Sequence, residues 1–294
     1  KSVVTANKDM VAQHGRELFE AAAASGRDIL FEGSVAGGIP IIRPLKECLA
    51  ANRISQVIGI INGTTNYMLT RMTREGINFN DVLREAQALG YAEADPSADV
   101  EGHDAARKLA ILASIAFNTR VALEQVYVEG ITRITAEDIT YASELNYVVK
   151  LLGIAKEGEA GVEARVHPAL LPKSHPLAAV NDVYNAIFVT GDAVGDVMFF
   201  GRGAGELPTA SAVTADVMNA ARNLIRKVPG IISCTCFDEK KVKAMGETFT
   251  KYYIRLDVAD RPGVLASIAF VLGNNDVSLA SVIQKHTTGH SAEI

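Results

Sequence analysis

The feature that most constrains the fold is a rhythm of short apolar strands, polar loops and helices in the first 117 residues. Two apolar segments, 28–32 and 54–61, are each followed by a loop rich in Gly, Ser, Thr or Asn. Helical patterns are predicted at about 9–25, 41–51, 67–74, 80–90 and 103–117. Strands that alternate with helices are typical of α/β folds. The sequence therefore predicts an α/β protein.

The pattern changes from about residue 125. Thr135 and Asp138 have the spacing of a capping box, which predicts a helix over 136–147. Extended segments with intervening turns are predicted next, at 148–156, 162–167 and 184–200, with the turns at Gly153, Gly158 and Gly191. A glycine-rich stretch then leads through Pro208 into a helix that ends near Lys227, and 228–250 has no strong period, as in a linker.

Composition excludes several classes of protein. The 29 basic and 34 acidic residues are spread along the chain, with no basic stripe suited to nucleic acid. No apolar run reaches the roughly 18 residues of a membrane-spanning helix. Three cysteines, Cys48, Cys234 and Cys236, are too few for a disulfide framework. We expect free thiols in a reducing compartment, which places the protein in the cytoplasm.

The strongest group of chemistry-bearing residues lies at 86–108, where five acidic residues precede or open a helix. Asp104 and Lys108 are four residues apart and share one helix face. That face continues through Ile111 and Ile115, so the charged pair should be partly buried. A desolvated lysine near carboxylates can transfer protons. The alternative is an ordinary helical ion pair beside an acidic loop.

The same segment, Ala86-x3-Gly90-Tyr91 followed by Asp95-Pro96-x2-Asp99-Val100-x-Gly102-x-Asp104-x3-Lys108, resembles the signature of homoserine dehydrogenases. Four further segments resemble that family in the same order along the chain: 3–8, 32–42, 59–67 and 203–210. Five motifs in order favour the catalytic interpretation of Asp104 and Lys108 over the ordinary ion pair.

The resemblance implies a role for individual residues. Lys108, Asp104 and Lys8 are the expected catalytic residues. Substrate binding is assigned to Glu93, Asp99, Tyr91, Thr64 and Gly63. Cofactor binding is assigned to Lys8, Gly203, Ala204 and Gly205. A monovalent cation, Na⁺ or K⁺, would be held by backbone carbonyls of Glu32, Val35, Gly37 and Ile39.

The C-terminal segment adds a second resemblance. A strand that ends in Asp260-Arg261-Pro262-Gly263, followed by a helix and a second strand up to about 284, resembles the first half of an ACT domain. The turn leaves backbone N–H groups at a helix start, which suits an anion. The alternative is a plain strand–helix–strand unit. The family resemblance implies threonine as the effector of this ferredoxin-like unit.

The chain departs from the family at the nucleotide-binding domain. No G-x-G-x-x-G follows a strand and opens a helix. We therefore expect a fragment that lacks most of that Rossmann-type domain and is inactive alone. The expected parts are a remnant of the nucleotide-binding domain at 1–30 and a catalytic and dimerisation domain with a mixed sheet at 31–207. A returning helix at 208–227, a linker at 228–250 and a partial ACT domain at 251–294 follow.

The leading hypothesis is an NAD- or NADP-dependent oxidoreductase that interconverts L-aspartate 4-semialdehyde and L-homoserine in threonine, methionine and isoleucine biosynthesis. The alternatives are an amino-acid sensor on a dehydrogenase-like scaffold and a related dehydrogenase with another amino-aldehyde substrate. A sensor has no use for a charged pair in line with an apolar helix face. The resemblance also implies a homodimer or homotetramer, with strands 184–200 as the expected interface.

Overall fold

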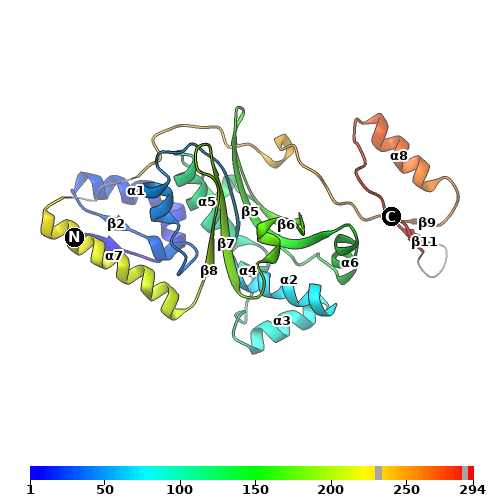
Figure 1. Cartoon of the computed structure of the whole chain (residues 1–294), viewed down its shortest axis with the longest axis horizontal. Helices are drawn as coiled ribbons and strands as arrows, with labels where there is room; N and C mark the ends of the chain where they lie inside the picture. The colour runs from blue at the N-terminus through cyan, green and yellow to red at the C-terminus, as the bar shows by residue number, and fades with distance from the viewer. Residues whose placement is uncertain (229–233, 287–290) are drawn as a thin grey trace.

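The structure, a computed structural model, describes residues 1–228, 234–286 and 291–294. Its centre is a six-stranded mixed sheet in the order β4-β6-β5-β3-β7-β8 (Figure 1). The strands are β3 (Ile54–Ile60), β4 (Tyr127–Val128), β5 (Tyr147–Gly158), β6 (Gly161–Pro172), β7 (Tyr184–Gly191) and β8 (Gly195–Arg202). All neighbours pair antiparallel except β4 and β6, which pair parallel. The expected α/β fold with a mixed sheet is confirmed.

Two helices pack against the sheet, because each carries a continuous apolar stripe. Helix α5 (His103–Ala116) contacts β3, β5 and β6, and helix α2 (Gly63–Glu75) contacts β5 and β7. Leu109 and Leu112 of α5 are fully buried in the main core. Helices α3 (Phe79–Ala88), α4 (Ser97–Val100) and α6 (Ala136–Glu144) lie beside α2 or α5 or against β5. The stripe predicted on α5 is thus the one that meets the sheet.

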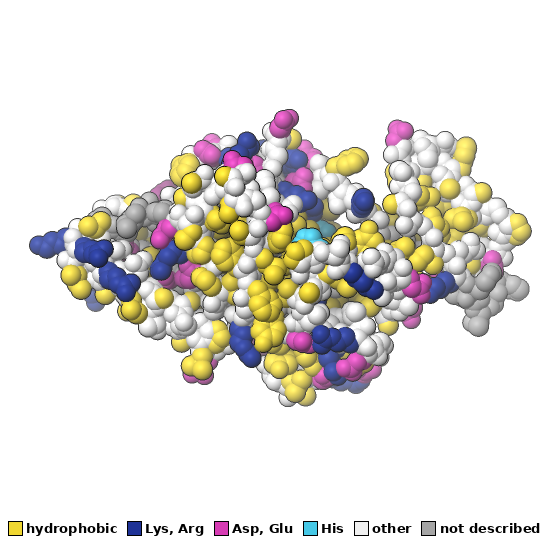
Figure 2. All heavy atoms as spheres, in the orientation of Figure 1, with side chains coloured by type: hydrophobic (Ala, Val, Ile, Leu, Met, Phe, Trp, Pro, Cys, Tyr) yellow, Lys and Arg dark blue, Asp and Glu magenta, His cyan; other side chains and the backbone are white. Residues whose placement is uncertain are grey.

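Alternate residues of the same strands form a second apolar cluster, because side chains of a strand point to opposite faces. It includes Ile58, Leu152 and Phe188, with Leu177 of a short 3₁₀ turn (Pro176–Ala179) packed on it. Met198 and Phe200 of β8 are 42% and 55% exposed. Figure 2 shows hydrophobic side chains gathered over the centre of the visible face, where Figure 1 places β7 and β8.

The N-terminal part forms a separate small layer. Strands β1 (Val3–Val4) and β2 (Ile29–Leu30) pair parallel across helix α1 (Lys8–Ala24). Helix α7 (Glu206–Arg226) returns to this layer and contacts β1 and the 3₁₀ turn at Glu32–Ser34. The chain therefore comes back, some 200 residues later, to the segment where it began (Figure 1).

The C-terminal unit consists of β9 (Asp257–Ala259), α8 (Val264–Asn274), β10 (Lys285–His286) and β11 (Ser291–Glu293). Strand β11 lies between β9 and β10 and is antiparallel to both. This is the split strand–helix–strand arrangement of one half of a ferredoxin-like fold. The unit docks on α6, where the Tyr253 hydroxyl donates to Asp138 at 3.0 Å and Arg255 donates to Thr135 at 2.9 Å.

The described part of the predicted linker, 234–250, contacts the rest of the protein. Asp238 donates its backbone N–H to the Asn118 carbonyl at 2.9 Å. The Lys240 ammonium lies 2.6 Å from a Glu157 carboxylate oxygen of β5. Val162 of β6 donates to the Lys241 carbonyl at 2.8 Å. This segment therefore runs along the sheet edge before the C-terminal unit begins. None of the described helices is both long and apolar enough to cross a membrane.

Several predicted boundaries are wrong. Helix α2 begins at Gly63 rather than at residue 67, because Asn62 accepts from the Thr65 N–H and caps the helix. Gly153 makes no turn and lies within β5. The turn expected at Gly191 is confirmed, because it divides 184–200 into β7 and β8. The helix expected at 41–51 contains a π-helical turn at Pro44–Cys48. The capping box of α6 is confirmed, but that helix ends at Glu144. The strands of the C-terminal unit are shorter than predicted.

One buried cation supports the loop between the 3₁₀ turn at Pro176–Ala179 and β7. Lys150 is 3% exposed and donates to the Val180 carbonyl at 2.6 Å and to Asn66 at 3.0 Å. Burial, helped by the Arg74 charge, lowers the pKa of Lys150 to about 8. The folded state then holds fewer protons than the unfolded state between about pH 8 and pH 10.5.

We therefore expect stability to rise with pH across this window, by at most about 3 kcal/mol, in comparison with Lys150→Met. Urea unfolding at a series of pH values measures the difference. Lys251→Met, at an exposed position, is the matched control. A difference between the native protein and Lys150→Met that stays constant with pH would contradict this account.

Candidate active site

The expected catalytic residues meet around one buried carboxylate. Asp104, in the first turn of α5, is 7% exposed. Its Oδ2 lies 2.6 Å from the Lys108 ammonium one turn later, and its Oδ1 lies 3.4 Å from the Lys8 ammonium. Lys108 also donates to the Ile61 carbonyl, at the end of β3, at 2.9 Å. Two lysines from different helices thus share one carboxylate.

Asn62 joins this cluster to a second acid. Its Oδ1 accepts from the Thr65 N–H, which fixes the side chain at the start of α2. Its Nδ2 then donates to Asp99 at 2.6 Å and to Asp104 at 3.0 Å. Asp95 instead accepts from the Ser97 N–H at 3.1 Å, just before α4. Asp99 is therefore the acid of this loop that contacts Asn62 of the cluster.

The ionic state of the cluster follows from its surroundings. Burial alone would raise the pKa of Asp104, because it disfavours the charged form. The Lys108 ammonium, the hydrogen bond from Asn62 and the Lys8 charge outweigh burial and hold the pKa of Asp104 below its usual value. The carboxylate therefore stays ionised at neutral pH and keeps both lysines in place.

Three of the expected substrate residues, Thr64, Tyr91 and Glu93, are here called the rim; Thr64 lies at the start of α2, and the other two follow α3. The Thr64 hydroxyl donates to the Tyr91 carbonyl at 2.7 Å, and the Tyr91 ring lies 4.9 Å from the Tyr67 ring. Glu93 is exposed, and its carbonyl accepts from Gln87 at 3.1 Å. No direct contact joins Glu93 to the Asp104 cluster within the described residues. Its carboxylate faces solvent, where it is accessible to a ligand.

Gly63 and Gly203, expected on the substrate and cofactor sides, lie on either side of Asn185 of β7. A Cβ at Gly203 would lie 2.2 Å from the Asn185 amide, and one at Gly63 would lie 3.0 Å from the Val183 carbonyl. Asn185 is 1% exposed, and its Oδ1 has no hydrogen-bond partner in the described part of the chain. No motif pointed to Asn185, because it lies at the start of the extended segment predicted at 184–200 and belongs to none of the matched segments.

The loop at 33–38 packs directly on the segment expected to bind cofactor. Gly37 has a φ of +50°, and a Cβ there would lie 2.6 Å from the Gly203 carbonyl oxygen. The Gly38 N–H donates to the Arg202 carbonyl at 3.2 Å. A side chain at Gly37 would therefore separate the two loops. Gly205, with a φ of +116°, precedes α7 and leaves the start of that helix without a side-chain cap.

The expected cation site uses only the backbone carbonyl of Glu32, but its side chain also makes contacts. Its buried carboxylate accepts three backbone N–H groups, from Ile41, Ile42 and Arg43, at 2.6–2.8 Å. Its own N–H donates at 2.8 Å to Asp216 of α7, which the sequence analysis did not identify. In the part of the chain that the structure describes, the carbonyls of Val35, Gly37 and Ile39 accept no hydrogen bond.

Unpaired carbonyls of buried residues suit a hard cation, which prefers oxygen ligands. The residues at 35–39 therefore fit the monovalent cation that the resemblance implies. Over the described ranges, no three His, Cys, Asp or Glu side chains are grouped so that they could hold a metal ion.

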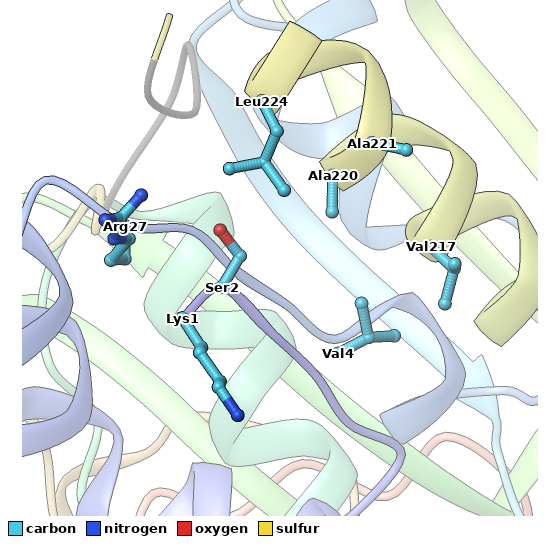
Figure 3. Close-up of a pocket in the computed structure, with 8 residues that line it drawn as sticks. All are labelled: Lys1, Ser2, Val4, Arg27, Val217, Ala220, Ala221 and Leu224. Carbon is cyan, nitrogen blue, oxygen red and sulfur yellow. The ribbon is translucent and has the colours of Figure 1, made fainter. Parts of the chain in front are cut away.

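A separate hollow of about 610 Å³ lies between β1 and α7 (Figure 3). Its lining includes Val4, Val217 and Leu224, with Lys1 and Arg27 at its margin. None of the expected catalytic residues lines it. The hollow therefore belongs to the N-terminal layer and not to the Asp104 cluster.

Comparison with known proteins gives matches along the whole chain. Residues 40–218 match the family model for homoserine dehydrogenase, and residues 252–294 match that for the ACT domain. A homoserine dehydrogenase of Synechocystis sp. is 50% identical over 100% of this chain and 70% of its own length. The crystal structure of a homoserine dehydrogenase from Thiobacillus denitrificans matches with a TM-score of 0.95 and 47% identity, over 100% of this chain and 68% of that one.

A hyperthermophilic archaeal homoserine dehydrogenase in complex with NADPH is 33% identical, with a TM-score of 0.66, over 76% of this chain and 64% of that one. The chain thus spans about two thirds of the length of these relatives. The family model and the matched relatives place the chain among oxidoreductases that act on a CH–OH group. The chain belongs to the homoserine dehydrogenase family, in the form that carries an ACT domain. A sensor without enzymatic activity is not favoured.

The contact between Gly203 and Asn185 gives a stability prediction. Gly203→Ala places a methyl group 2.2 Å from the Asn185 side-chain amide, so the buried Asn185 side chain or one of the two backbones must move. We expect a loss of about 1–3 kcal/mol in the free energy of unfolding. Gly246→Ala, where nothing lies within 4 Å, is the matched control. Equal thermal stability of the two variants would contradict this packing.

Proposed function

We propose that this chain provides the substrate-reducing part of a homoserine dehydrogenase, which interconverts L-aspartate 4-semialdehyde and L-homoserine. The observation that carries the proposal is the Lys8–Asp104–Lys108 cluster, half-buried and anchored to β3 and α5. Reduction of an aldehyde develops negative charge on its oxygen. An ammonium group near that oxygen stabilises the charge and can supply the proton.

Lys108 is the proposed proton donor. It is 12% exposed at the side chain, and the Asp104 and Ile61 oxygens fix the direction of its ammonium group. The Lys8 side chain is more exposed, at 35%, and its ammonium group contacts the other carboxylate oxygen of Asp104. Asp104 therefore acts as a positioning residue for both lysines. In homoserine oxidation, Lys108 would take up the hydroxyl proton.

Glu93 and Thr64 lie on the rim where the amino-acid part of the substrate would bind. The exposed Glu93 carboxylate can pair with the substrate ammonium group. Asp99, held by Asn62, adds negative charge on the same side. This arrangement would orient the substrate so that its aldehyde end points toward Lys108.

The cofactor of the proposed reaction is NADP or NAD, and NADPH is named for the archaeal relative. When bound, the nicotinamide supplies the hydride. The residues present fit such a group, because Gly205 opens α7 without a side-chain cap in the described chain, which leaves backbone N–H groups for a phosphate, and the buried Asn185 Oδ1 is without a partner there. Lys8 would lie on the cofactor side of the cluster. Val35, Gly37 and Ile39, with Glu32, would hold Na⁺ or K⁺.

The proposed assembly is a homodimer or homotetramer. The sheet face that carries the Ile58, Leu152 and Phe188 cluster supports this assembly, because Met198 and Phe200 of β8 are exposed beside that cluster. The proposed effector of the C-terminal unit is threonine. Gly263, with a φ of +92°, opens α8 without a side-chain cap and leaves N–H groups for a carboxylate. The free cysteines support a cytoplasmic location.

Lys108→Ala in the enzyme that carries this chain should lower kcat by about 10²–10⁴-fold, with a smaller change in KM. Lys8→Ala is the matched comparison, because both lysines contact Asp104. The dependence of the oxidative rate on pH separates them. Loss of the basic limb of that profile in Lys8→Ala, with the limb retained in Lys108→Ala, would reverse the assignment.

Glu93→Gln tests the substrate side. Removal of a charge-assisted pair from a partly buried complex should weaken homoserine binding by about 1.5–3 kcal/mol. The expected result is a KM for homoserine about ten- to a hundredfold higher, with little change in the KM for the nucleotide. Glu101→Gln, an exposed acid that pairs with His103, is the control. An unchanged KM in Glu93→Gln would remove Glu93 from the site.

A further inference from the structure

A second candidate site lies far from the rim residues, where 234–236 crosses the C-terminal half of α5. Cys234, Thr235 and Cys236 line a cavity of about 370 Å³ between α1 and α5. Apolar side chains form much of the remaining lining, among them Val11, Phe19, Phe31, Ile111, Ile115 and Val121. The proposed reaction uses none of these groups.

The backbone holds the two cysteines close together. The Phe237 N–H donates to the Thr235 carbonyl at 3.0 Å, which closes a tight turn at Cys236. The Cys236 N–H donates to the Cys234 Sγ at 3.4 Å. The Cys236 Sγ in turn lies 3.8 Å from the Ser114 carbonyl of α5. One thiol is therefore exposed at the cavity mouth, and the other is half-buried against the helix.

The surroundings make the two sulfur atoms chemically unequal. The hydrogen bonds from the Cys236 thiol and the Cys236 N–H, with a smaller effect of the Lys46 charge, outweigh burial and lower the pKa of Cys234 to about 6. Sharing that hydrogen bond, together with burial, raises the pKa of Cys236. Lys46 is held over the rings of Phe19 and Phe31, at 5.7 and 5.3 Å from their centres. At neutral pH the pair is thus one thiolate and one thiol.

We propose that Cys234 and Cys236 form a peroxide-sensitive dithiol site that closes to a disulfide within the chain. The Cys234 sulfur attacks one peroxide oxygen, the O–O bond breaks, and the other oxygen leaves with a proton as water or an alcohol. Cys234 is then a sulfenic acid. The Cys236 sulfur attacks the Cys234 sulfur, the S–O bond breaks, and the hydroxyl leaves with the Cys236 proton as water. The peroxide gains two electrons and the two thiols lose them.

Closure has a local structural effect. The disulfide removes the thiol hydrogen of Cys236, whose Sγ lies 3.8 Å from the Ser114 carbonyl. It also removes the negative charge beside Lys46. The first change lies against α5, and the second lies beside Lys46 of the π-helical turn at Pro44–Cys48, which contacts the Phe19 ring of α1. The first turns of α1 and α5 carry Lys8 and Asp104.

Mass spectrometry of the intact reduced protein after treatment with hydrogen peroxide tests the site. We expect a loss of two hydrogens per chain, mapped to the peptide that contains Cys234 and Cys236. Cys236→Ser should stop at a sulfenic acid on Cys234, which dimedone traps. Cys48→Ser should still close, because Cys48 is exposed and lies on a separate segment. Disulfides between chains, or oxidation of Cys48 before Cys234, would overturn the proposal.

Alkylation of the native protein gives a measurement that needs no variant. At pH 7 Cys234 should react with iodoacetamide about tenfold or more faster than Cys48, because a larger fraction of it is thiolate. Peptide mapping of partially alkylated protein gives the ratio. Equal rates at the two cysteines would contradict the proposed activation of Cys234.

Discussion

The active-site architecture depends on one buried carboxylate that two lysines share. Asp104 is placed at the start of α5, where α1, the end of β3 and the start of α2 converge. Burying a carboxylate without partners would be costly, so the Lys108, Lys8 and Asn62 contacts are what allow it to remain charged. The ion pair of Arg107 with Asp9 joins the same two helices one turn away. The proposed acid–base chemistry and the packing of α1 on α5 therefore rest on the same charges.

A second constraint is the close approach of two backbones. The loop at 33–38 and the segment at 203–208 touch where Gly37 meets Gly203 and where Gly38 meets Pro208. The Glu32 carboxylate and Asp216 then tie this contact to the following helix and to α7. These contacts join the loop proposed to hold the cation to the segment proposed to bind the cofactor. A substitution in either loop should change the position of the Asn185 side chain, because Asn185 packs on Gly203.

The sequence predicts what is local or carried by a contiguous motif. The apolar face of α5 placed Asp104 and Lys108 at a half-buried position, and the structure confirms it. The start of α2 was missed because Asn62 was assigned to a loop, although Asn before a helix is a common cap. Asp216 could not be found, because its contact with Glu32 joins residues 184 positions apart. Asn185 could not be found either, because its neighbours Gly63 and Gly203 come from two separate segments that only the fold brings together. The docking of the C-terminal unit on α6 likewise depends on long-range pairs such as Tyr253 with Asp138.

The ionisation of Asp104 is the most direct test of this account. Carbon-13 NMR of the side-chain carboxyls in selectively labelled protein follows the titration of Asp104, with Asp104→Asn identifying its signal. The account predicts a pKa below the usual value for aspartate, and a higher pKa in Lys108→Met, where the nearest cation is gone. A pKa of Asp104 at or above the usual value, unchanged in Lys108→Met, would contradict the shared-carboxylate arrangement.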